Sequence, residues 1–425
     1  MKKFKFWAIF LIIIFVFWKF LIPGPRVASD FPFASSESVK TGFSLPQTWS
    51  RSGENFGSNN ISTLWSWPVD FLYGAGVSLG VDFFLLVRIF EIFFMLFLGY
   101  FSVGKLLDSL GVKNSGKLVG ILFYLLNTFL LILVDGGQLA IALAYSWFPM
   151  AYLLVKNSLK EGLGDKLTSG LAISILGFFD IRFVYVLFIL LALNFIYESI
   201  FLKRKKIFSY LISWLSTALV SGLVFVGLNI YWILPSVLAK APALPETYQR
   251  VTQTAFLSLA NLGHSLLLLQ PHWYKNVFGK VTPLLSGFVL IPLLVFIAPI
   301  LRRKSKMVGF WLLVAVTGVF LVKGANPPFL GVYPWLFEKL PGFNLFRDPT
   351  KFFFLVALSY AVLIGVTVDE ITQRFSGFKI KNNFLKSSQR SWSCFAYILN
   401  PKSAVSLLVV YFLFLIRPVW LGQMT

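Results

Sequence analysis

The sequence opens with a nearly unbroken apolar run, FKFWAIFLIIIFVFWKFLI at 4–22, which is followed by PGPRVASDFPF at 23–33. A run of about 20 apolar residues is long enough to cross a bilayer as a helix. The basic residues before it resemble the start of a signal peptide. However, the run is too long and no small-residue cleavage site follows, so we expect an uncleaved first span. This span would place the carboxylate of Asp30 a few residues beyond the membrane.

The composition is that of a membrane protein. The 425 residues are 57% hydrophobic, 18% aromatic and 13% charged, with a mean hydropathy of +0.78. Soluble domains carry about 25% charged residues, so we expect an all-α polytopic protein whose solvent is the lipid bilayer. The net charge of +21 does not indicate nucleic acid, because the basic residues lie in short runs between apolar segments. Cys394 is the only cysteine and there are two histidines, which excludes an internal disulfide and argues against a zinc site.

The apolar runs predict a single membrane domain over 1–425, with about eleven transmembrane helices and a cytoplasmic N-terminus. The predicted spans are 4–22, 83–103, 118–134, 139–155, 167–179, 183–202, 207–238, 284–301, 307–322, 352–368 and 403–419. The external loops are expected at about 24–82, 239–283 and 323–349, of which the first two are long, and a basic cytoplasmic segment at about 369–402. We therefore expect a multi-pass protein of the plasma membrane, with its polar clusters on the extracytoplasmic face.

The fifth predicted span is unusually short. Its 13 residues, 167–179, would form a helix about 20 Å long, less than the ~30 Å hydrocarbon core. A hairpin with the next apolar run keeps both flanking basic loops inside the cell. It also places Asp180 and Arg182 below the outer surface, in a polar cavity. Ionisable groups at such a depth are candidates for function, and an internal ion pair is the alternative.

Two polar clusters lie in predicted outer turns. Asp30 suits a helix cap or a turn, and it also suits a general base that accepts a proton from a hydroxyl group. Asp135-Gly-Gly-Gln138 suits a tight interhelical turn, in which glycine allows backbone angles that other residues resist. The polarity of that turn at a lipid boundary makes Asp135 and Gln138 candidate binding residues.

Other candidates lie within or beside predicted spans. Arg88 and Glu91 are three residues apart in span 2, so a structural ion pair is the favoured interpretation, although Arg88 lies near the outer end, where a lipid phosphate would lie. Arg347 and Lys351 suit either interfacial anchoring or a phosphate clamp at the start of a helix. His264 suits an interfacial position or, less readily, substrate binding.

Taken together, these segments resemble the GT-C superfamily of polytopic glycosyltransferases, and most closely the prokaryotic YfhO-like and arabinofuranosyltransferase-like membrane proteins. Ser29-Asp30-Phe-Pro-Phe matches the acidic residue that follows the first span in that superfamily. Phe346-Arg347-Asp348-Pro349-Thr-Lys351 resembles the Phe-Arg-x-Pro-x-Lys/Arg string before a late span. The order also matches between these two motifs, with Asn127-Thr-Phe, then Asp135-Gly-Gly-Gln138, then Trp147-Phe-Pro149.

The resemblance implies an inverting transfer of a sugar from a polyprenyl-phosphate donor to a hydroxyl of a glycan or glycolipid acceptor, on the extracytoplasmic face. Asp30 would deprotonate the acceptor. Arg347, Lys351 and either Arg182 or Arg88 would hold the donor phosphate. Asp135, Gln138, Asp180 and His264 are the remaining expected substrate contacts.

Several alternatives stay open at this stage. No second acid lies beside Asp30 in the sequence, and related proteins continue into large external domains, so we expect either a piece of a longer protein or a member without acceptor-binding domains. A transporter or flippase of lipid-linked glycans would show repeat symmetry and polar residues at the midplane. A non-catalytic transferase-like membrane protein is the third possibility. The sequence assigns no cofactor and leaves a divalent cation open.

Overall fold

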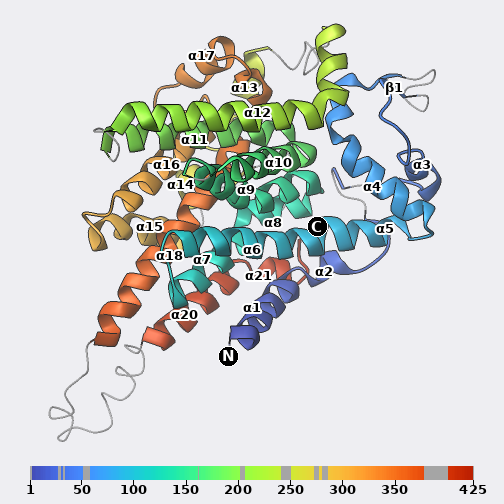
Figure 1. Ribbon diagram of the computed structural model, residues 1–425. Coiled ribbons are helices and arrows are strands. Elements are labelled where there is room, and N and C mark those ends of the chain that lie inside the picture. Colours follow the sequence, from blue (N-terminus) through green and yellow to red (C-terminus); the bar gives the residue numbers. More distant parts are fainter. Residues whose placement is uncertain are drawn as a thin grey trace, which may run out of the picture.

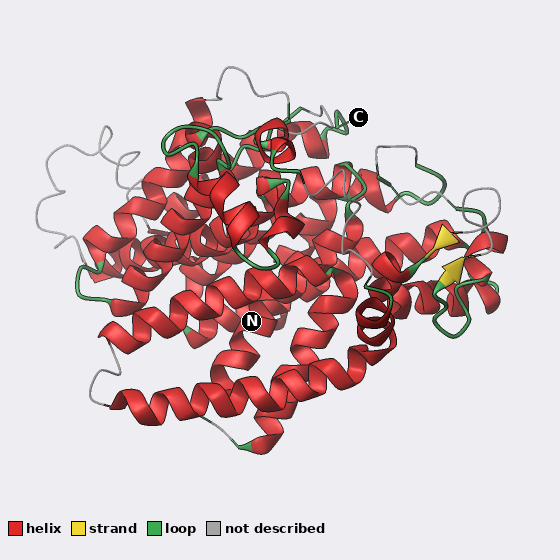
Figure 2. Ribbon diagram, turned by 90° about the horizontal axis from the view of Figure 1, so that it is seen from above, coloured by secondary structure: helices red, strands yellow, loops and turns green. Residues whose placement is uncertain are grey.

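The computed structural model describes residues 2–26, 30–31, 34–50, 58–160, 162–201, 206–240, 250–271, 277–279, 286–377 and 401–424. These residues are almost entirely helical (Figure 1). The exception is one antiparallel pairing of two-residue strands, β1 (Trp49–Ser50) and β2 (Ser58–Asn59), at the edge of the molecule (Figure 2). The predicted all-α class is therefore confirmed.

Each of the eleven predicted spans coincides with one helix or with consecutive helices. The elements up to residue 135 are α1 (Lys2–Val16), α2 (Trp18–Leu21), α3 (Ser36–Lys40), η1 (Ile61–Ser66), α4 (Trp67–Ser78), α5 (Phe83–Leu86), η2 (Val87–Phe93), α6 (Phe94–Ser109), α7 (Asn114–Leu126) and α8 (Thr128–Asp135). The elements from 139 to 267 are α9 (Leu139–Ser158), α10 (Leu163–Phe179), α11 (Ile181–Phe201), α12 (Ile207–Leu238), α13 (Thr252–Leu257) and α14 (Leu262–Leu267). The last are η5 (Ser286–Val289), α15 (Leu290–Leu301), α16 (Lys306–Val322), α17 (Val332–Lys339), η6 (Phe343–Phe346), η7 (Pro349–Phe352), α18 (Phe353–Gly377), α20 (Pro401–Leu415) and α21 (Arg417–Trp420).

Six of these helical segments are long and apolar enough to cross a membrane. They are Phe83–Ser109, Asn114–Asp135, Leu139–Ser158, Ile181–Phe201, Ile207–Leu238 and Pro349–Arg374. Shorter apolar helices lie at Ser286–Leu301, Lys306–Val322 and Ser403–Leu415. The chain is thus an all-α membrane protein, and the count of eleven crossings and their direction stay predictions.

The helices pack in a defined order. In Figure 1, α12 and α6 run across the view with α10 and α9 between them, and each neighbouring pair is in contact. Helix α6 then packs on α7, and α7 packs on α18, which also contacts α15 and α16. The most apolar stretch of the Pro349–Arg374 segment is entirely buried, whereas that of α12 is 11% buried. A helix that is apolar all round and enclosed forms the core, so α18 is central and α12 faces lipid.

Close approach of α7 and α18 depends on glycine. A Cβ on Gly116 would lie 2.2 Å from the carbonyl oxygen of Gly365, and one on Gly120 would lie 2.9 Å from the carbonyl oxygen of Ala361. Small residues let helix backbones meet in a membrane, where packing rather than the hydrophobic effect holds helices together. This contact fixes the position of α18, and with it the η6–η7 segment that precedes it.

The predicted outer loops contain structure of their own. The segment expected as a loop at 24–82 holds α3, η1 and α4, and the segment expected as a loop at 239–283 holds α13 and α14. The predicted break between the fifth and sixth spans is at Asp180, whose extended backbone separates α10 from α11. Helix α10 begins at Leu163 and is therefore longer than the predicted 13-residue arm.

A substitution tests the α7–α18 contact. We expect Gly116→Ala to lower the free energy of unfolding by about 1–3 kcal/mol, because an added methyl group in a close-packed core forces backbone shifts. Gly222→Ala is the matched control, since nothing lies within 4 Å of a Cβ at that position and alanine favours helix by about 1 kcal/mol. Thermal unfolding in detergent checks both, and equal unfolding temperatures would contradict the packing argument.

Candidate functional site

A cavity of about 580 Å³ gathers most of the polar residues that the sequence singled out. Seven ionisable side chains line it: Asp30, Glu91, Asp180, Arg182, Arg347, Asp348 and Lys351. Gln138 lies among them. Six of the nine predicted site residues therefore share one cavity, namely Asp30, Gln138, Asp180, Arg182, Arg347 and Lys351. They come from segments that are far apart in the chain.

Asp30 is held by the glycine turn between α8 and α9. The Asp30 backbone N–H donates to the carbonyl of Gly136 at 2.9 Å, and Gln138 Nε2 donates to Asp30 Oδ2 at 3.0 Å. Gly137 has φ +79°, and a Cβ there would lie 2.0 Å from the backbone nitrogen of Phe31. Both the backbone angle and the contact require glycine. The Asp-Gly-Gly-Gln turn therefore holds Asp30 in place through a backbone hydrogen bond, a side-chain hydrogen bond and close packing.

The same glutamine connects Asp30 to the string before α18. Lys351 Nζ donates to Gln138 Oε1 at 3.5 Å and pairs with Asp348 at 3.2 Å. Asp348 Oδ1 in turn accepts from the backbone N–H of Thr350 at 3.0 Å, and so caps η7. Because Lys351 occupies the amide oxygen of Gln138, the amide nitrogen is directed to Asp30. The carboxylate and the lysine are thus oriented by one side chain.

Asp180 and Arg182 form a two-point ion pair. Arg182 Nε donates to Asp180 Oδ1 at 2.9 Å, and Arg182 Nη2 donates to Oδ2 at 2.5 Å. Asp180 is buried at 1% exposure, while the Arg182 side chain keeps 31%. A bidentate pair fixes the plane of the guanidinium group. The ion pair that the sequence left open as an alternative is therefore present, and it holds Arg182 in one orientation at the cavity.

Arg88 and Asp135 do not line the cavity, and both contact the segment that follows α2. Arg88 donates to the carbonyls of Gly24 at 2.7 Å and Ile22 at 3.2 Å, and its guanidinium lies 5.3 Å from the ring of Phe31. Asp135, fully buried, pairs with Arg26 at 3.1 Å. These contacts hold the segment after α2 against the protein. They position Asp30, a role other than the donor-phosphate contact predicted for Arg88 and the substrate contact predicted for Asp135.

The expected Arg88–Glu91 ion pair is wrong. The two side chains belong to η2, a π-helical segment, and no ion pair joins them although both are described. A π-helix closes its hydrogen bonds over five residues rather than four, so residues three apart no longer share a face. Arg88 instead turns to the segment after α2, and Glu91 to the cavity.

His264 lies outside the cavity. Its backbone N–H donates to the Asn261 side chain at 2.9 Å, and its Nδ1 accepts from the Asn261 backbone N–H at 3.4 Å. This reciprocal arrangement is a capping box that starts α14. The predicted substrate contact of His264 has no counterpart in the lining of the cavity.

Three residues with charged or aromatic side chains line the cavity and were not among the predicted site residues: Trp65, Glu91 and Asp348. Glu91 was singled out only as the partner of Arg88, although an acid inside a predicted span is a functional candidate by default. Asp348 lay inside the string already singled out. Trp65 carried no signal, because it is one of several tryptophans in a long polar segment. Among the described residues, no group of three or more His, Cys, Asp or Glu side chains is placed to hold a metal ion.

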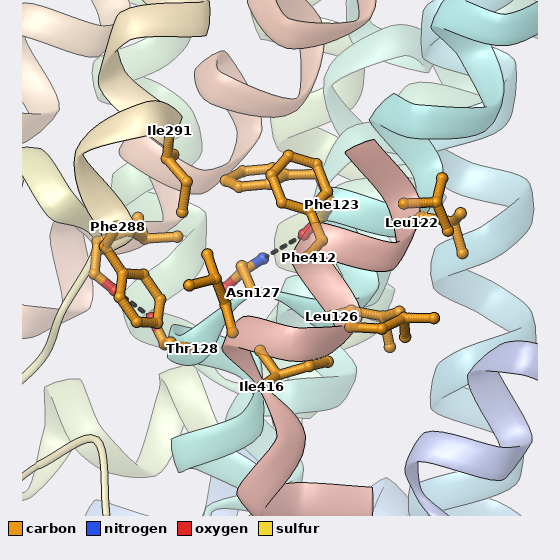
Figure 3. A pocket seen from close by; sticks show the side chains of 13 residues that line it. Leu122, Phe123, Leu126, Asn127, Thr128, Phe288, Ile291, Phe412 and Ile416 are labelled. Carbon is orange, nitrogen blue, oxygen red and sulfur yellow. Dashed lines mark hydrogen bonds between the residues drawn. The ribbon is translucent and has the colours of Figure 1, made fainter. Parts of the chain in front are cut away.

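Two other cavities are apolar. The cavity drawn in Figure 3 lies between α7, α15 and α20 and has a volume of about 20 Å³, room for little more than one water molecule. Asn127 at its wall is satisfied by Tyr145 at 2.9 Å and by backbone carbonyls. A groove of about 450 Å³ lies between α10, α11 and α12 and is lined by no charged residue. The charged chemistry is therefore concentrated in the 580 Å³ cavity.

Comparison with known proteins adds no assignment. No protein-family model matches the chain, and no curated protein matches it. The functional argument therefore rests on the residues of the cavity.

The contact between the glycine turn and the Asp30 segment can be tested by substitution. We expect Gly137→Ala to lower the unfolding temperature more than Gly111→Ala does. Both residues have positive φ, +79° and +75°, and so share a backbone cost of about 1–2 kcal/mol, but only Gly137 touches another segment. Thermal unfolding in detergent is the measurement. An equal fall in unfolding temperature in the two variants would show that the Asp30 segment does not pack against the turn.

Proposed function

We propose that this protein is a glycosyltransferase that moves a sugar from a polyprenyl-phosphate donor to a hydroxyl group of a glycan or glycolipid acceptor. The reaction would take place at the extracytoplasmic face of the cell membrane, the side to which the distribution of Lys and Arg assigns the cavity. The observation that carries the proposal is the presence, in one cavity of a helical membrane protein, of an accessible carboxylate and three cationic side chains.

The cationic side chains suit a phosphate that gains charge. Arg182, Arg347 and Lys351 all line the cavity. When the bond between the sugar and the phosphate breaks, negative charge develops on the leaving phosphate, and preorganised cations stabilise it more in the transition state than in the bound donor. Arg182 is held in plane by Asp180, and Lys351 is held by Asp348 and Gln138. Their orientation is therefore set before the donor binds.

Asp30 suits the role of base. Its side chain is exposed to the cavity and accepts a hydrogen bond from Gln138 at 3.0 Å, and within the described part of the chain no ion pair reaches it. A carboxylate oxygen is thus available to an incoming hydroxyl group. In the proposed step, the acceptor oxygen bonds to the anomeric carbon and its proton passes to Asp30. The phosphate leaves with the electron pair of the broken bond.

The base assignment predicts a specific loss. Asp30→Asn keeps the shape and the contact with Gln138 but removes the basic oxygen, and general-base catalysis contributes about 10²–10⁴-fold to rate. We expect transfer from radiolabelled polyprenyl-phosphate sugars in membranes to fall by about that factor. Glu37→Gln is the control, since Glu37 is a neighbouring acid whose side chain is 86% exposed.

Equal incorporation by wild type and Asp30→Asn would remove Asp30 as the base. Movement of the lipid-linked sugar across the membrane without transfer to any acceptor would instead favour the transporter alternative.

The phosphate assignment makes a separate prediction about binding. We expect Lys351→Met to weaken binding of farnesyl phosphate by about tenfold or more, because a hydrogen bond to a charged group contributes about 1.5–3 kcal/mol. Lys339→Met is the matched control, on the exposed end of α17. Titration of the purified protein in detergent provides the affinities. Unchanged affinity in Lys351→Met, or an equal loss in both variants, would contradict the clamp.

A further inference from the structure

Asp348 is a carboxylate within the proposed phosphate site, and the proposed transfer step uses it only to hold Lys351. It lines the 580 Å³ cavity together with Arg347 and Lys351. Its Oδ2 atom lies 3.2 Å from Lys351 Nζ. An anion in this place opposes the binding of any phosphate to the same ammonium group. The negative charge of Asp348 therefore needs an explanation of its own.

The Asp348 carboxylate is held by hydrogen bonds within its own segment. Its Oδ1 atom accepts from the backbone N–H of Thr350 at 3.0 Å and from the Thr350 hydroxyl at 2.6 Å. These bonds cap η7, which leads directly into the buried helix α18. Asp348 therefore stays beside Lys351 when a ligand enters the cavity.

Capping alone does not require a charge at this position. Asparagine and serine cap helices about as well as aspartate does, and the side-chain oxygen of asparagine can accept the same two hydrogen bonds. Two other helices of the chain, α8 and α14, are capped by asparagine, at Asn127 and Asn261. What aspartate adds at position 348 is a negative charge next to Lys351, and this charge also acts on Arg182.

The proposed reaction changes the charge of the phosphate group. The donor is a phosphodiester with a single negative charge. The product, polyprenyl phosphate, is a monoester with a charge of roughly −1.5 to −2 at neutral pH, because its second pKa is about 6. A site made of cations alone binds the more highly charged product more tightly than the donor. Such a site would hold the product and slow its release, a step that limits the rate of many enzymes.

We propose that Asp348 sets the charge preference of the phosphate site, because its carboxylate weakens binding of the doubly charged product relative to the singly charged donor. This inference rests on the proposed transferase function and adds a residue that favours product release. A phosphate oxygen bound to Lys351 Nζ lies within about 6 Å of Asp348 Oδ2, since both oxygens are close to the same ammonium group. Repulsion at that distance increases in proportion to the charge of the phosphate. The transition state is affected less than the product, because its phosphate has gained only part of the second charge.

Two probes that differ by one charge test the proposal. Farnesyl methyl phosphate is a diester with a single negative charge, and farnesyl phosphate at about pH 8 is a doubly charged monoester, since its second pKa is about 6. Both would be titrated against the purified protein in detergent. We expect Asp348→Asn to increase the affinity for farnesyl phosphate about tenfold more than the affinity for farnesyl methyl phosphate.

Asp82→Asn is the matched control. Asp82 caps α5 through a hydrogen bond from the backbone N–H of Leu85, so the substitution removes the same charge from the same kind of cap. Asp82 is exposed and does not line the cavity. Both affinities of this variant should equal those of the wild type.

The outcomes separate this inference from the proposed function. If the ratio of the two affinities in Asp348→Asn is unchanged, or shifts toward farnesyl methyl phosphate, Asp348 only caps η7 and orients Lys351, and the inference is overturned. An equal shift in Asp82→Asn overturns it as well. Binding of farnesyl phosphate by the wild type leaves the proposed phosphate site standing in each of these cases, whereas failure of the wild type to bind either probe overturns both proposals. If Asp348→Asn does not fold, Asp348→Ser, which also caps helices, replaces it with the same expected shift.

Discussion

The contact between the segment after α2 and the glycine turn at 136–138 determines the site. It joins residues that are 108 positions apart, through the hydrogen bond between Gln138 and Asp30. A side chain on Gly137 would overlap the backbone of Phe31, so the two segments can meet only because that position is glycine. Gln138 then extends the contact to Lys351. Without this contact, nothing would fix the position of the Asp30 carboxylate relative to Lys351 and the other cations of the cavity.

Much of the fold could be predicted from the sequence because the bilayer imposes simple rules. The length of the apolar runs and the placement of the basic residues predicted eleven spans, and each coincides with one helix or with consecutive helices. Packing order could not be read in the same way. Helix α18 is enclosed and α12 faces outward, yet their most apolar stretches have similar hydropathy. What distinguishes them is that α18 is surrounded by α7, α15 and α16, whereas α12 packs mainly on α10, and this depends on which helices become neighbours.

The sequence predicted those residues of the candidate site that are charged or polar and lie between apolar segments. Asp30, Gln138, Asp180, Arg182, Arg347 and Lys351 line one cavity. Arg88 and Glu91 were misjudged as a pair because the spacing was interpreted as α-helical, whereas η2 is a π-helix. His264 was predicted to contact substrate because histidine side chains often bind ligands. Its role in a capping box could not be predicted, since that role depends on the local backbone geometry. Asp135 and Arg88 hold the Asp30 segment, a role that becomes visible only with tertiary contacts.

The proposed function requires that the donor phosphate binds beside Arg347 and Lys351 in the 580 Å³ cavity, with the sugar within reach of Asp30. The most direct measurement is an experimental structure of the protein with farnesyl-phosphoryl glucose bound. It should show the phosphate oxygens within hydrogen-bond reach of Lys351 and Arg347, and the anomeric carbon of the sugar facing Asp30. Density for the ligand in the apolar groove between α10, α11 and α12, with the polar cavity empty, would contradict the account.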